Sequence, residues 1–304
     1  MTSRIGWRNL AWVFLGSSVG ACGMGGSDPA VALLPSAEVT DPVAGDNPFN
    51  SVAPRAGSEC ALRYDFAGES SDVECQTEHI GGSPLHWITT CPAHDWVATE
   101  QEVELDADGR MVLFRQQGPG DTQDNFSYTY DASGRLVQLG AMTFDQFDAG
   151  GHPVHATYHG ADWLGVDDKP IPGTGDEAGA FAYDANGRLV SIAWTLTHFD
   201  SVYFSETIAY DDAARTRNYE VIIDARVVFP ETGVGHNGGY DQFDAAGNIV
   251  EHYWFRPPAQ EGEHDDDLTD YVYDESGRLL THTFTVRGFR GPASYVAHHI
   301  YDCQ

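Results

Sequence analysis

The sequence has few positive charges and almost no lysine. Lysine and arginine together number 16 against 46 aspartates and glutamates, so the formal net charge is −30, and Lys169 is the sole lysine. A surface this acidic repels phosphate backbones and anionic lipid headgroups, which argues against nucleic acid as a partner. Cations, basic proteins and neutral sugars remain as candidate ligands.

The apolar run near the N-terminus, centred on Leu10 to Leu15, is shorter than the roughly 20 residues that a membrane-spanning helix needs. It follows Arg4 and Arg8 and ends in small residues, as a secretory signal peptide does. Residues 1–21 are therefore expected to be a signal peptide that is removed from an exported protein.

The end of this segment, "VGAC" (Val19 to Cys22), resembles the lipobox of bacterial lipoproteins. The resemblance implies cleavage before Cys22 and acylation of Cys22 with diacylglycerol and a further chain such as palmitate, which together give stable membrane anchoring. Gly23 follows where an Asp would favour the inner membrane, so the expected location is the outer membrane. The alternative is plain secretion, with Cys22 as an ordinary cysteine.

Sequence motifs of known enzyme classes are missing from the exported part. There is no zinc-protease motif, no nucleotide-binding glycine loop and no C-x-x-C pair, and no two carboxylates stand out. "GSSVG" (Gly16 to Gly20) matches a serine-hydrolase pattern but lies in the signal peptide. We expect no catalytic residues and a non-enzymatic protein.

Two regions precede the main domain. Residues 22–56 are rich in Gly, Ser, Pro, Ala and Asp without periodic apolar residues, which indicates a flexible tether that begins at Cys22. Residues 57–100 hold three cysteines and lack the repeat described next. We expect this second region to cap the first edge of the sheet that follows.

Four cysteines remain beside Cys22, and an even number in an exported chain predicts two disulfides with three connectivities. We favour a local bridge near the N-terminus and a long-range bridge to the last strand. The cysteines are Cys60 with Cys75, and Cys91 with Cys303.

A short motif recurs along the remaining two-thirds of the chain, residues 101–304. "YTYDASGRLVQL" (Tyr128 to Leu139) returns as "FAYDANGRLVSI" and "YVYDESGRLLTH". The spacing of the motif varies from 17 residues (Asp131 to Asp148) to 36 residues (Asp148 to Asp184), so insertions fall between units. Seven copies begin at Asp106, Asp131, Asp148, Asp184, Asp211, Asp244 and Asp274.

Each copy predicts an antiparallel hairpin. Side chains alternate with period two on both sides of the motif, which is typical of strands. The Asp can accept backbone hydrogen bonds and the Gly three residues later suits a left-handed conformation. Ala214 replaces that Gly in the Asp211 copy, so a different turn is expected there. The predicted turn residues are Asp106 and Gly109, Asp131 and Gly134, Asp184 and Gly187, Asp244 and Gly247, and Asp274 and Gly277.

The motif resembles the RHS or YD-repeat family, named after the Tyr-Asp dipeptide seen at Tyr130-Asp131, Tyr183-Asp184, Tyr210-Asp211 and Tyr273-Asp274. The resemblance implies spiralling antiparallel sheets, which in large members enclose a toxin and in others display adhesive surfaces. Seven units are too few for a large shell. We therefore expect an all-β array of hairpins that forms a curled, twisted meander sheet or a short β-solenoid.

Two groups of residues are weak metal candidates. His155 and His159 share one face of a strand, and clustered carboxylates in an expected loop suit calcium. The simpler interpretation is a variable repeat segment and an acidic loop, so no cofactor is expected. The acidic candidates are Asp265, Asp266, Asp267 and Asp270.

The leading expectation is a lipid-anchored cell-envelope protein that displays a β-surface to an envelope protein or glycan. A carbohydrate-binding or carbohydrate-active protein is the first alternative, with Trp163, Trp194 and Trp254 as sugar platforms if they are exposed. An accessory or fragment of an RHS-type toxin system is the second alternative.

Overall fold

The computed structural model describes residues 59–67, 72–93, 99–117, 123–162, 169–228, 233–256, 265–287 and 293–301. The predicted signal peptide, Cys22, the tether and Cys303 lie outside these residues. The described chain is almost entirely β-strand, with two single-turn 3₁₀ helices, η2 (Ile80–Gly82) and η4 (Ala225–Val227).

Eighteen strands make up the sheet. The first nine are β1 (Glu59–Phe66), β2 (Val73–His79), β3 (His86–Thr90), β4 (Glu100–Leu105), β5 (Met111–Gln117), β6 (Gln123–Tyr130), β7 (Leu136–Leu139), β8 (Met142–Phe147) and β9 (Pro153–His159). The second nine are β10 (Asp176–Tyr183), β11 (Leu189–Leu196), β12 (Ser201–Asp211), β13 (Thr216–Asp224), β14 (Val234–Phe243), β15 (Ile249–Arg256), β16 (Asp265–Tyr273), β17 (Leu279–Arg287) and β18 (Ala293–Tyr301).

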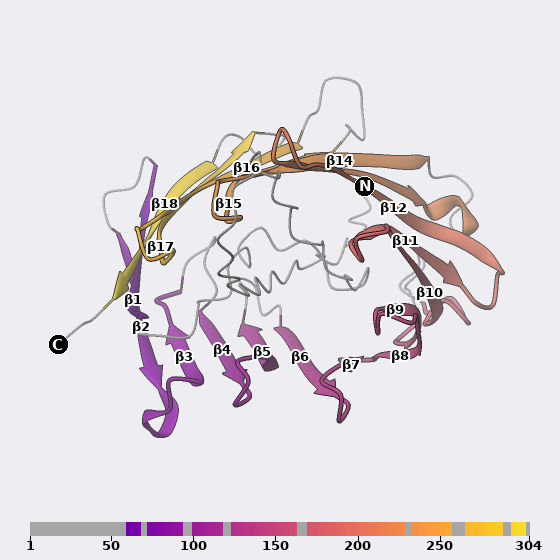
Figure 1. The fold of residues 1–304 in the computed structure, drawn as a ribbon, viewed down its shortest axis with the longest axis horizontal. Coiled ribbons are helices and arrows are strands. Elements are labelled where there is room, and N and C mark those ends of the chain that lie inside the picture. The colour runs from indigo at the N-terminus through magenta and orange to yellow at the C-terminus, as the bar shows by residue number, and fades with distance from the viewer. Residues whose placement is uncertain are drawn as a thin grey trace, which may run out of the picture.

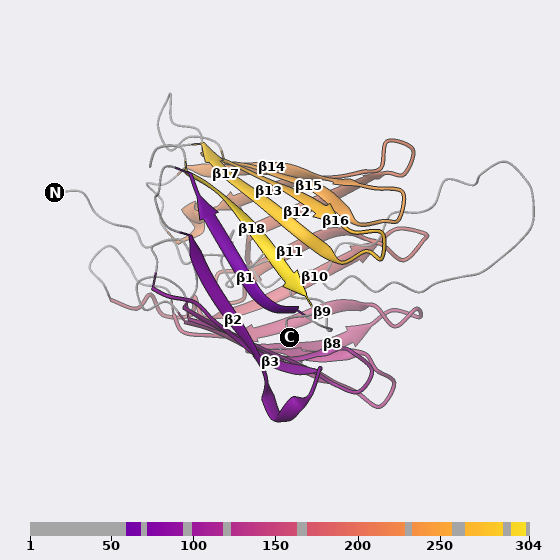
Figure 2. The same cartoon turned by 90° about the vertical axis from the view of Figure 1, so that its left-hand side faces the viewer.

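The sheet is closed. Each strand pairs antiparallel with the next strand along the chain, and β18 pairs antiparallel with β1 from Glu59↔Tyr301 to Phe66↔Tyr295. Figures 1 and 2 show the indigo β1 beside the yellow β18, so the first and last strands meet at one seam. The all-β hairpin array is as expected, but the open curled sheet or solenoid is wrong. The protein is a closed 18-stranded up-and-down β-barrel. It closes because β1 pairs with the edge of the last strand, β18, that would otherwise be free.

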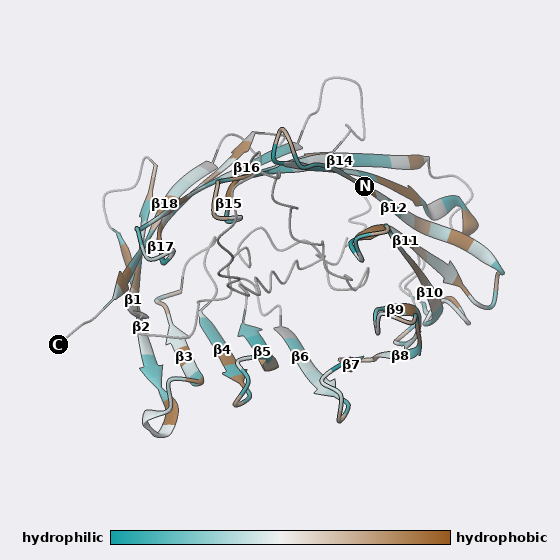
Figure 3. Ribbon diagram, in the orientation of Figure 1, coloured by the Kyte–Doolittle hydropathy of each residue, from teal (hydrophilic) through white to brown (hydrophobic). Residues whose placement is uncertain are grey.

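Side-chain alternation gives the barrel wall two different faces. In β11, Ile192, Trp194 and Leu196 are fully buried, and the residues between them are partly exposed. No described helix or strand covers the outside of the barrel, so the buried set faces the axis. Figure 3 shows hydrophobic and hydrophilic residues interspersed along the strands, as this alternation requires.

The hydrophobic core lies on this inner face. Its largest cluster extends from β3 to β15. One smaller cluster joins β1, β2 and Cys91, and another joins β17, β18 and β1. Burying aliphatic and aromatic side chains in this way supplies the main favourable term in folding. Core members include Trp87, Val103, Met111, Phe114, Ile192, Trp194, Val221, Trp254, Phe284 and Tyr295.

The outer face is polar. β4 presents Glu100, Glu102 and Glu104 outward, and β17 presents Thr281, Thr283 and Thr285. Large exposed hydrophobics among the described residues are scattered singly. They are Phe199, Val202, Val272 and Leu280.

Residues 57–100 do not form a cap as expected. Their described part contains β1, β2 and β3, which are full members of the barrel wall, and β3 pairs with β4 from His86↔Glu104 to Thr90↔Glu100. A closed sheet has no edge for a cap to protect.

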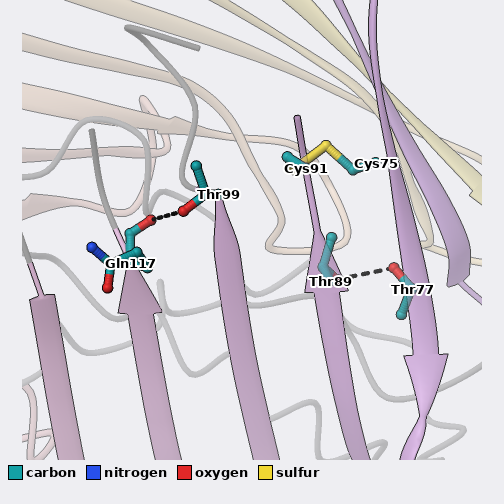
Figure 4. Close-up of a disulfide and its surroundings, with 6 residues drawn as sticks. All are labelled: Cys75, Thr77, Thr89, Cys91, Thr99 and Gln117. Carbon is teal, nitrogen blue, oxygen red and sulfur yellow. Dashed lines mark hydrogen bonds between the residues drawn. A yellow bond between two sulfur atoms is a disulfide. The ribbon is translucent and has the colours of Figure 1, made fainter. Parts of the chain in front are cut away.

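The disulfide connectivity differs from the expected one. Cys75 on β2 is bonded to Cys91, just after β3, and both are buried on the inner face (Figure 4). The predicted pairs Cys60–Cys75 and Cys91–Cys303 are therefore wrong. The bridge joins two neighbouring antiparallel strands that the Thr77–Thr89 hydroxyl bond of 2.9 Å also joins. The side chains of Cys60 and Cys303 lie outside the described residues.

Within the described ranges, no helix is long and apolar enough to cross a membrane.

Candidate functional site

The repeat turns have a common geometry. At six of the seven predicted positions the Asp N–H donates to the carbonyl four residues later, and the Gly N–H donates back to the Asp carbonyl. In the Asp131 turn, Oδ1 accepts the N–H groups of Ser133 (2.8 Å) and Arg135 (3.0 Å), and Oδ2 accepts Arg135 Nε (2.7 Å). Gly134 has φ of 80°, a conformation that glycine adopts without strain. The Asp, Gly and Arg thus form one structural unit.

The hydrogen bonds of these units act on the Asp carboxylates. The bond from the Arg110 side chain, with the backbone N–H groups, lowers the pKa of Asp106. The Ser276 hydroxyl and the Arg278 side chain do the same to the pKa of Asp274. The turn carboxylates are fully occupied by their own loops, so the repeat turns are structural elements and not ligand sites.

The arginine and tyrosine of the motif connect successive hairpins. The Arg188 guanidinium lies 4.2 Å from the ring centre of Tyr210, which belongs to the next Tyr-Asp dipeptide. The Tyr210 hydroxyl donates to the carbonyl of Leu189, the residue after that arginine, at 2.9 Å. We call this arrangement the Tyr–Arg lock. The same lock recurs at Arg110 with Tyr130 and at Arg278 with Tyr301.

The lock explains the repeated dipeptide. The tyrosine joins its hairpin to the preceding one, and the adjacent Asp builds the turn of its own hairpin. His152 replaces the arginine in one copy, bonds Asp148 at 3.0 Å and stacks on Tyr183 at 4.8 Å. The Asp211 copy has a different turn, as predicted from Ala214. There Arg215 takes the positive φ of 56°.

A buried charge cluster lies on the inner face of β13, β14 and β15, and sequence reasoning missed it. Asp241 is 0% exposed and accepts Arg217 Nη2 at 2.7 Å, the Tyr219 hydroxyl, and His252 Nδ1 at 2.7 Å. Burial alone would raise the pKa of Asp241, but the Arg217 charge and the His252 bond lower it to about 2. The alternation of Arg217 with Tyr219 in β13 is the signal that places both inward. Every member of the cluster is satisfied by another, so the cluster is structural.

A second buried pair lies near the seam. His282 on β17 and His299 on β18 are 3.1 Å apart through Nδ1 and Nε2, and the Tyr295 ring is 5.7 Å from His282. Burial lowers the pKa of His282 well below its usual range, and the neighbouring His299 adds to the effect. The folded protein therefore favours the neutral imidazole of His282.

The structure does not gather the predicted metal ligands. Asp265 to Asp270 lie within strand β16 and not in a loop, so Asp266 and Asp270 face outward while Asp267 faces inward. His155 bonds Asp145 at 2.5 Å, and His159 bonds Asp176 at 2.8 Å, each as a separate outer-face pair. Among the described residues, no three His, Cys, Asp or Glu side chains come together as a metal site would require.

Trp194 and Trp254 do not offer an outer platform for sugars. Trp194 and Trp254 are 0% and 5% exposed and belong to the core, while Trp163 lies outside the described residues. The carbohydrate alternative therefore loses the support of Trp194 and Trp254.

A group of four side chains stands out on the outer face of β14, β15 and β16. Tyr240 and Tyr253 face each other across the strands with ring centres 5.4 Å apart. Glu251 lies directly opposite Asp270 and accepts a hydrogen bond from the Tyr240 hydroxyl. We call these four residues the outer tyrosine–carboxylate patch. Sequence reasoning missed the patch because its members come from three strands whose register was unknown.

The electrostatics of the patch reflect two facing carboxylates. The bond to Glu251 raises the pKa of Tyr240 to about 12. Partial burial, together with the Glu251 charge, raises the pKa of Asp270. Like charges placed directly opposite each other in a sheet are unfavourable, so this arrangement has a cost for the isolated barrel.

Comparison with known proteins places the chain in no family. No protein-family model matches it, and no curated protein does. Its backbone is similar to that of a porin-like protein from Bacteroides uniformis, with 12% identity over 82% of this chain and 98% of that chain and a TM-score of 0.44. It is also similar to a TcdB2–TccC3–Cdc42 complex, with 12% identity over 69% of this chain and 16% of that chain (TM-score 0.21). A third similarity is to the Photorhabdus luminescens Tc holotoxin pore, with 12% identity over 71% and 16% (TM-score 0.21).

Proposed function

We propose that this chain is a short YD-repeat lipoprotein, anchored to the outer membrane through Cys22, whose barrel displays its outer wall for binding and catalyses no reaction. The observation that carries the proposal is the sidedness of the wall. The buried side chains that face inward are mostly apolar, and the outward rows are mostly polar, with Glu, Asp, Thr, Ser and His.

Sidedness bears on where the barrel resides. Barrels that sit in a bilayer present an apolar band to the lipid, flanked by aromatic girdles. The outward Glu100, Glu102 and Glu104 of β4 instead suit water. A polar barrel reaches the membrane through its lipid, and the stretch from Cys22 to β1 separates the two.

Rigidity also supports display. The Tyr–Arg locks and the closed hydrogen-bond ladder hold the outward residues of neighbouring strands in fixed register. A surface whose side chains are already ordered loses less entropy when it binds. The sheet wall thus suits contact with an envelope protein or glycan.

Two experiments test the proposal. Fractionation of cells should place the wild-type protein in the outer membrane and the Cys22→Ser variant in the soluble exported fraction. Retention of Cys22→Ser in the membrane would contradict lipid anchoring.

Photo-crosslinking on intact cells tests display. A photoreactive residue at Thr207 on the outer face of β12 should give a discrete crosslinked product, and one at the neighbouring inward Ile208 should give none. Scanning one exposed position on every other strand, including Glu100 on β4, covers the whole wall. If no outward position gives a product that Ile208 lacks, the display function is wrong.

A further inference from the structure

We propose that the outer tyrosine–carboxylate patch (Tyr240, Glu251, Tyr253 and Asp270) binds an arginine side chain of a basic protein partner. This inference deepens the proposed function by naming the chemistry of the partner and the part of the wall that receives it. Four observations support it. They are the negative charge of the outward row that contains Glu251 and Asp270, the tyrosine rings beside that row, the arginine sites within the repeats, and the net charge of the chain.

The row that contains the carboxylates is negative. In strand order across the outer face it reads Gln242, Glu251, Asp270, Thr283, and these residues are direct cross-strand partners. Opposed carboxylates have Cβ atoms about 4.5–5.5 Å apart in such a register. None of the four side chains carries a positive charge, so a cation from outside would relieve the repulsion between Glu251 and Asp270.

The next row supplies aromatic surface. It reads Tyr240, Tyr253, Leu268, Thr285, and the two tyrosine rings are tilted by 32° to each other. Tyr253 is two residues from Glu251 along β15, and Tyr240 is two residues from Gln242 along β14, so the two rows are neighbours on the same face. A planar cation held by Glu251 therefore reaches a ring face, where the ring quadrupole attracts it.

The protein already uses this combination inside its own repeats. In each Tyr–Arg lock a guanidinium lies between an Asp carboxylate and a tyrosine ring. Arg110, for example, is 2.6 Å from Asp106 Oδ2 and 4.6 Å from the Tyr130 ring centre. The patch presents the carboxylate and tyrosine halves of that arrangement on the outside of the barrel. Arginine fits it better than lysine because the guanidinium is planar and bonds a carboxylate in bidentate fashion.

Overall charge favours the same class of partner. The chain has a net charge of −30, so a basic partner is attracted from a distance before it makes contact. The patch then provides the local geometry that total charge cannot.

The test is a titration of the full chain with a fluorescently labelled Gly-Arg-Gly-Arg-Gly peptide, followed by anisotropy at physiological salt. The double substitution E251Q/D270N should weaken binding about 10-fold, because it removes charge-assisted hydrogen bonds. Tyr253→Ala should weaken it about 3-fold through loss of the ring. The matched control is E100Q/E104Q on β4, which changes the net charge by the same amount on another part of the wall and should have little effect.

Three results would overturn the inference. Equal weakening by both double variants would mean that the peptide responds only to total charge. Equal affinity for a matched Gly-Lys-Gly-Lys-Gly peptide would show that the patch does not recognise the planar guanidinium. Binding of a neutral oligosaccharide at the patch, without binding of the peptide, would assign it to a sugar. Thermal unfolding monitors folding, and E251Q/D270N should melt at the same or a higher temperature because a like-charge pair is gone. Crosslinking from Thr207 and the other outward positions would still report display if the patch fails.

Discussion

At the scale of single residues, the Tyr–Arg lock accounts for the sequence repetition. The tyrosine supplies a hydroxyl that reaches the preceding hairpin, and the arginine spans from its own Asp to the next ring. Two copies carry phenylalanine in place of the tyrosine, Phe147 and Phe243. The turn arginine Arg135 lies over the Phe147 ring, whereas the arginine over the Phe243 ring is Arg217, which pairs with Asp241 and not with a turn. The stacking half of the lock therefore persists at Phe147, where the hydroxyl half is lost.

Reciprocal substitutions test the hydroxyl half. Tyr210→Phe removes the bond to the Leu189 carbonyl and should destabilise the barrel by about 0.5–1.5 kcal/mol. Phe147→Tyr should stabilise it by up to about 1 kcal/mol, because its ring already lies under Arg135 and a hydroxyl would reach the Leu136 carbonyl. Urea unfolding of both variants provides the measurement. A loss of stability in Phe147→Tyr would show that the copies are not equivalent.

The buried ion pair predicts a larger effect. Asp241→Asn removes the carboxylate charge that pairs with the buried Arg217 guanidinium and should cost about 3–5 kcal/mol. Asp224→Asn is the matched control, because it removes the partner of Arg226 in an exposed pair and should leave stability nearly unchanged. Equal unfolding midpoints in urea for the two variants would contradict a structural role for the inner cluster.

At the scale of strands and hairpins, the local sequence predicts the turns but does not predict the register between strands. The six standard turns were predictable because the Asp, the Gly and the residue four after the Asp act within five residues of each other, and that last residue is Arg in four turns, His152 in one and Asn248 in one. The register of β14, β15 and β16 depends on loops and bulges, such as the shift at Phe243↔Ile249, that no short motif encodes. For that reason Tyr240, Glu251, Tyr253 and Asp270 were not recognised as neighbours. The prediction of a loop at Asp265 to Asp270 is wrong because the four aspartates among these six residues lie within strand β16.

The buried His282 of the β17–β18 hairpin predicts that the stability of the barrel depends on pH. His282 has a folded pKa below its unfolded value of about 6.5, so the native state favours the neutral imidazole. The contribution of neutral His282 to the free energy of unfolding is complete above about pH 6.5. It is lost as the pH falls below that value, by up to about 1.4 kcal/mol per pH unit. The groups that face it are His299 and Tyr295 on β18 and Tyr271 on β16.

Urea unfolding between pH 7 and pH 5 measures this dependence. His282→Gln keeps a hydrogen-bonding side chain that does not titrate, and it should flatten the loss of stability on acidification. His298→Gln, on the outer face beside Asp65, is the control and should retain the steep loss. The same slope in His282→Gln and the wild type would assign the acid sensitivity to other groups.

At the scale of the whole molecule, closure was the feature that the sequence did not predict. Seven repeat turns indicate an array, but whether an array stays open depends on strand number, tilt and stagger summed around the sheet. The outcome rests on both ends of the chain. β18 ends in Tyr301, whose hydroxyl donates to the Leu279 carbonyl like the tyrosine of an eighth repeat, and β1 takes the place of the missing second strand. The segment expected to be a cap was thus part of the wall.

Closure also predicts the second disulfide. Because Cys75 pairs with Cys91, the cysteines left beside Cys22 are Cys60 and Cys303. Glu59, the neighbour of Cys60 on β1, pairs with Tyr301 at the end of β18. Tyr301 lies two residues before Cys303. We expect a Cys60–Cys303 bond that fastens the seam, with a stabilisation of up to about 5 kcal/mol in the chain-entropy model because the loop is so long.

Peptide mapping without reduction should recover Cys75–Cys91 and Cys60–Cys303 as the two linked pairs. A double Cys60→Ser/Cys303→Ser variant should unfold at lower urea while keeping its Cys75–Cys91 bond. Recovery of Cys60 and Cys303 as free thiols in the exported protein would mean that backbone pairing between β1 and β18 closes the barrel without covalent help.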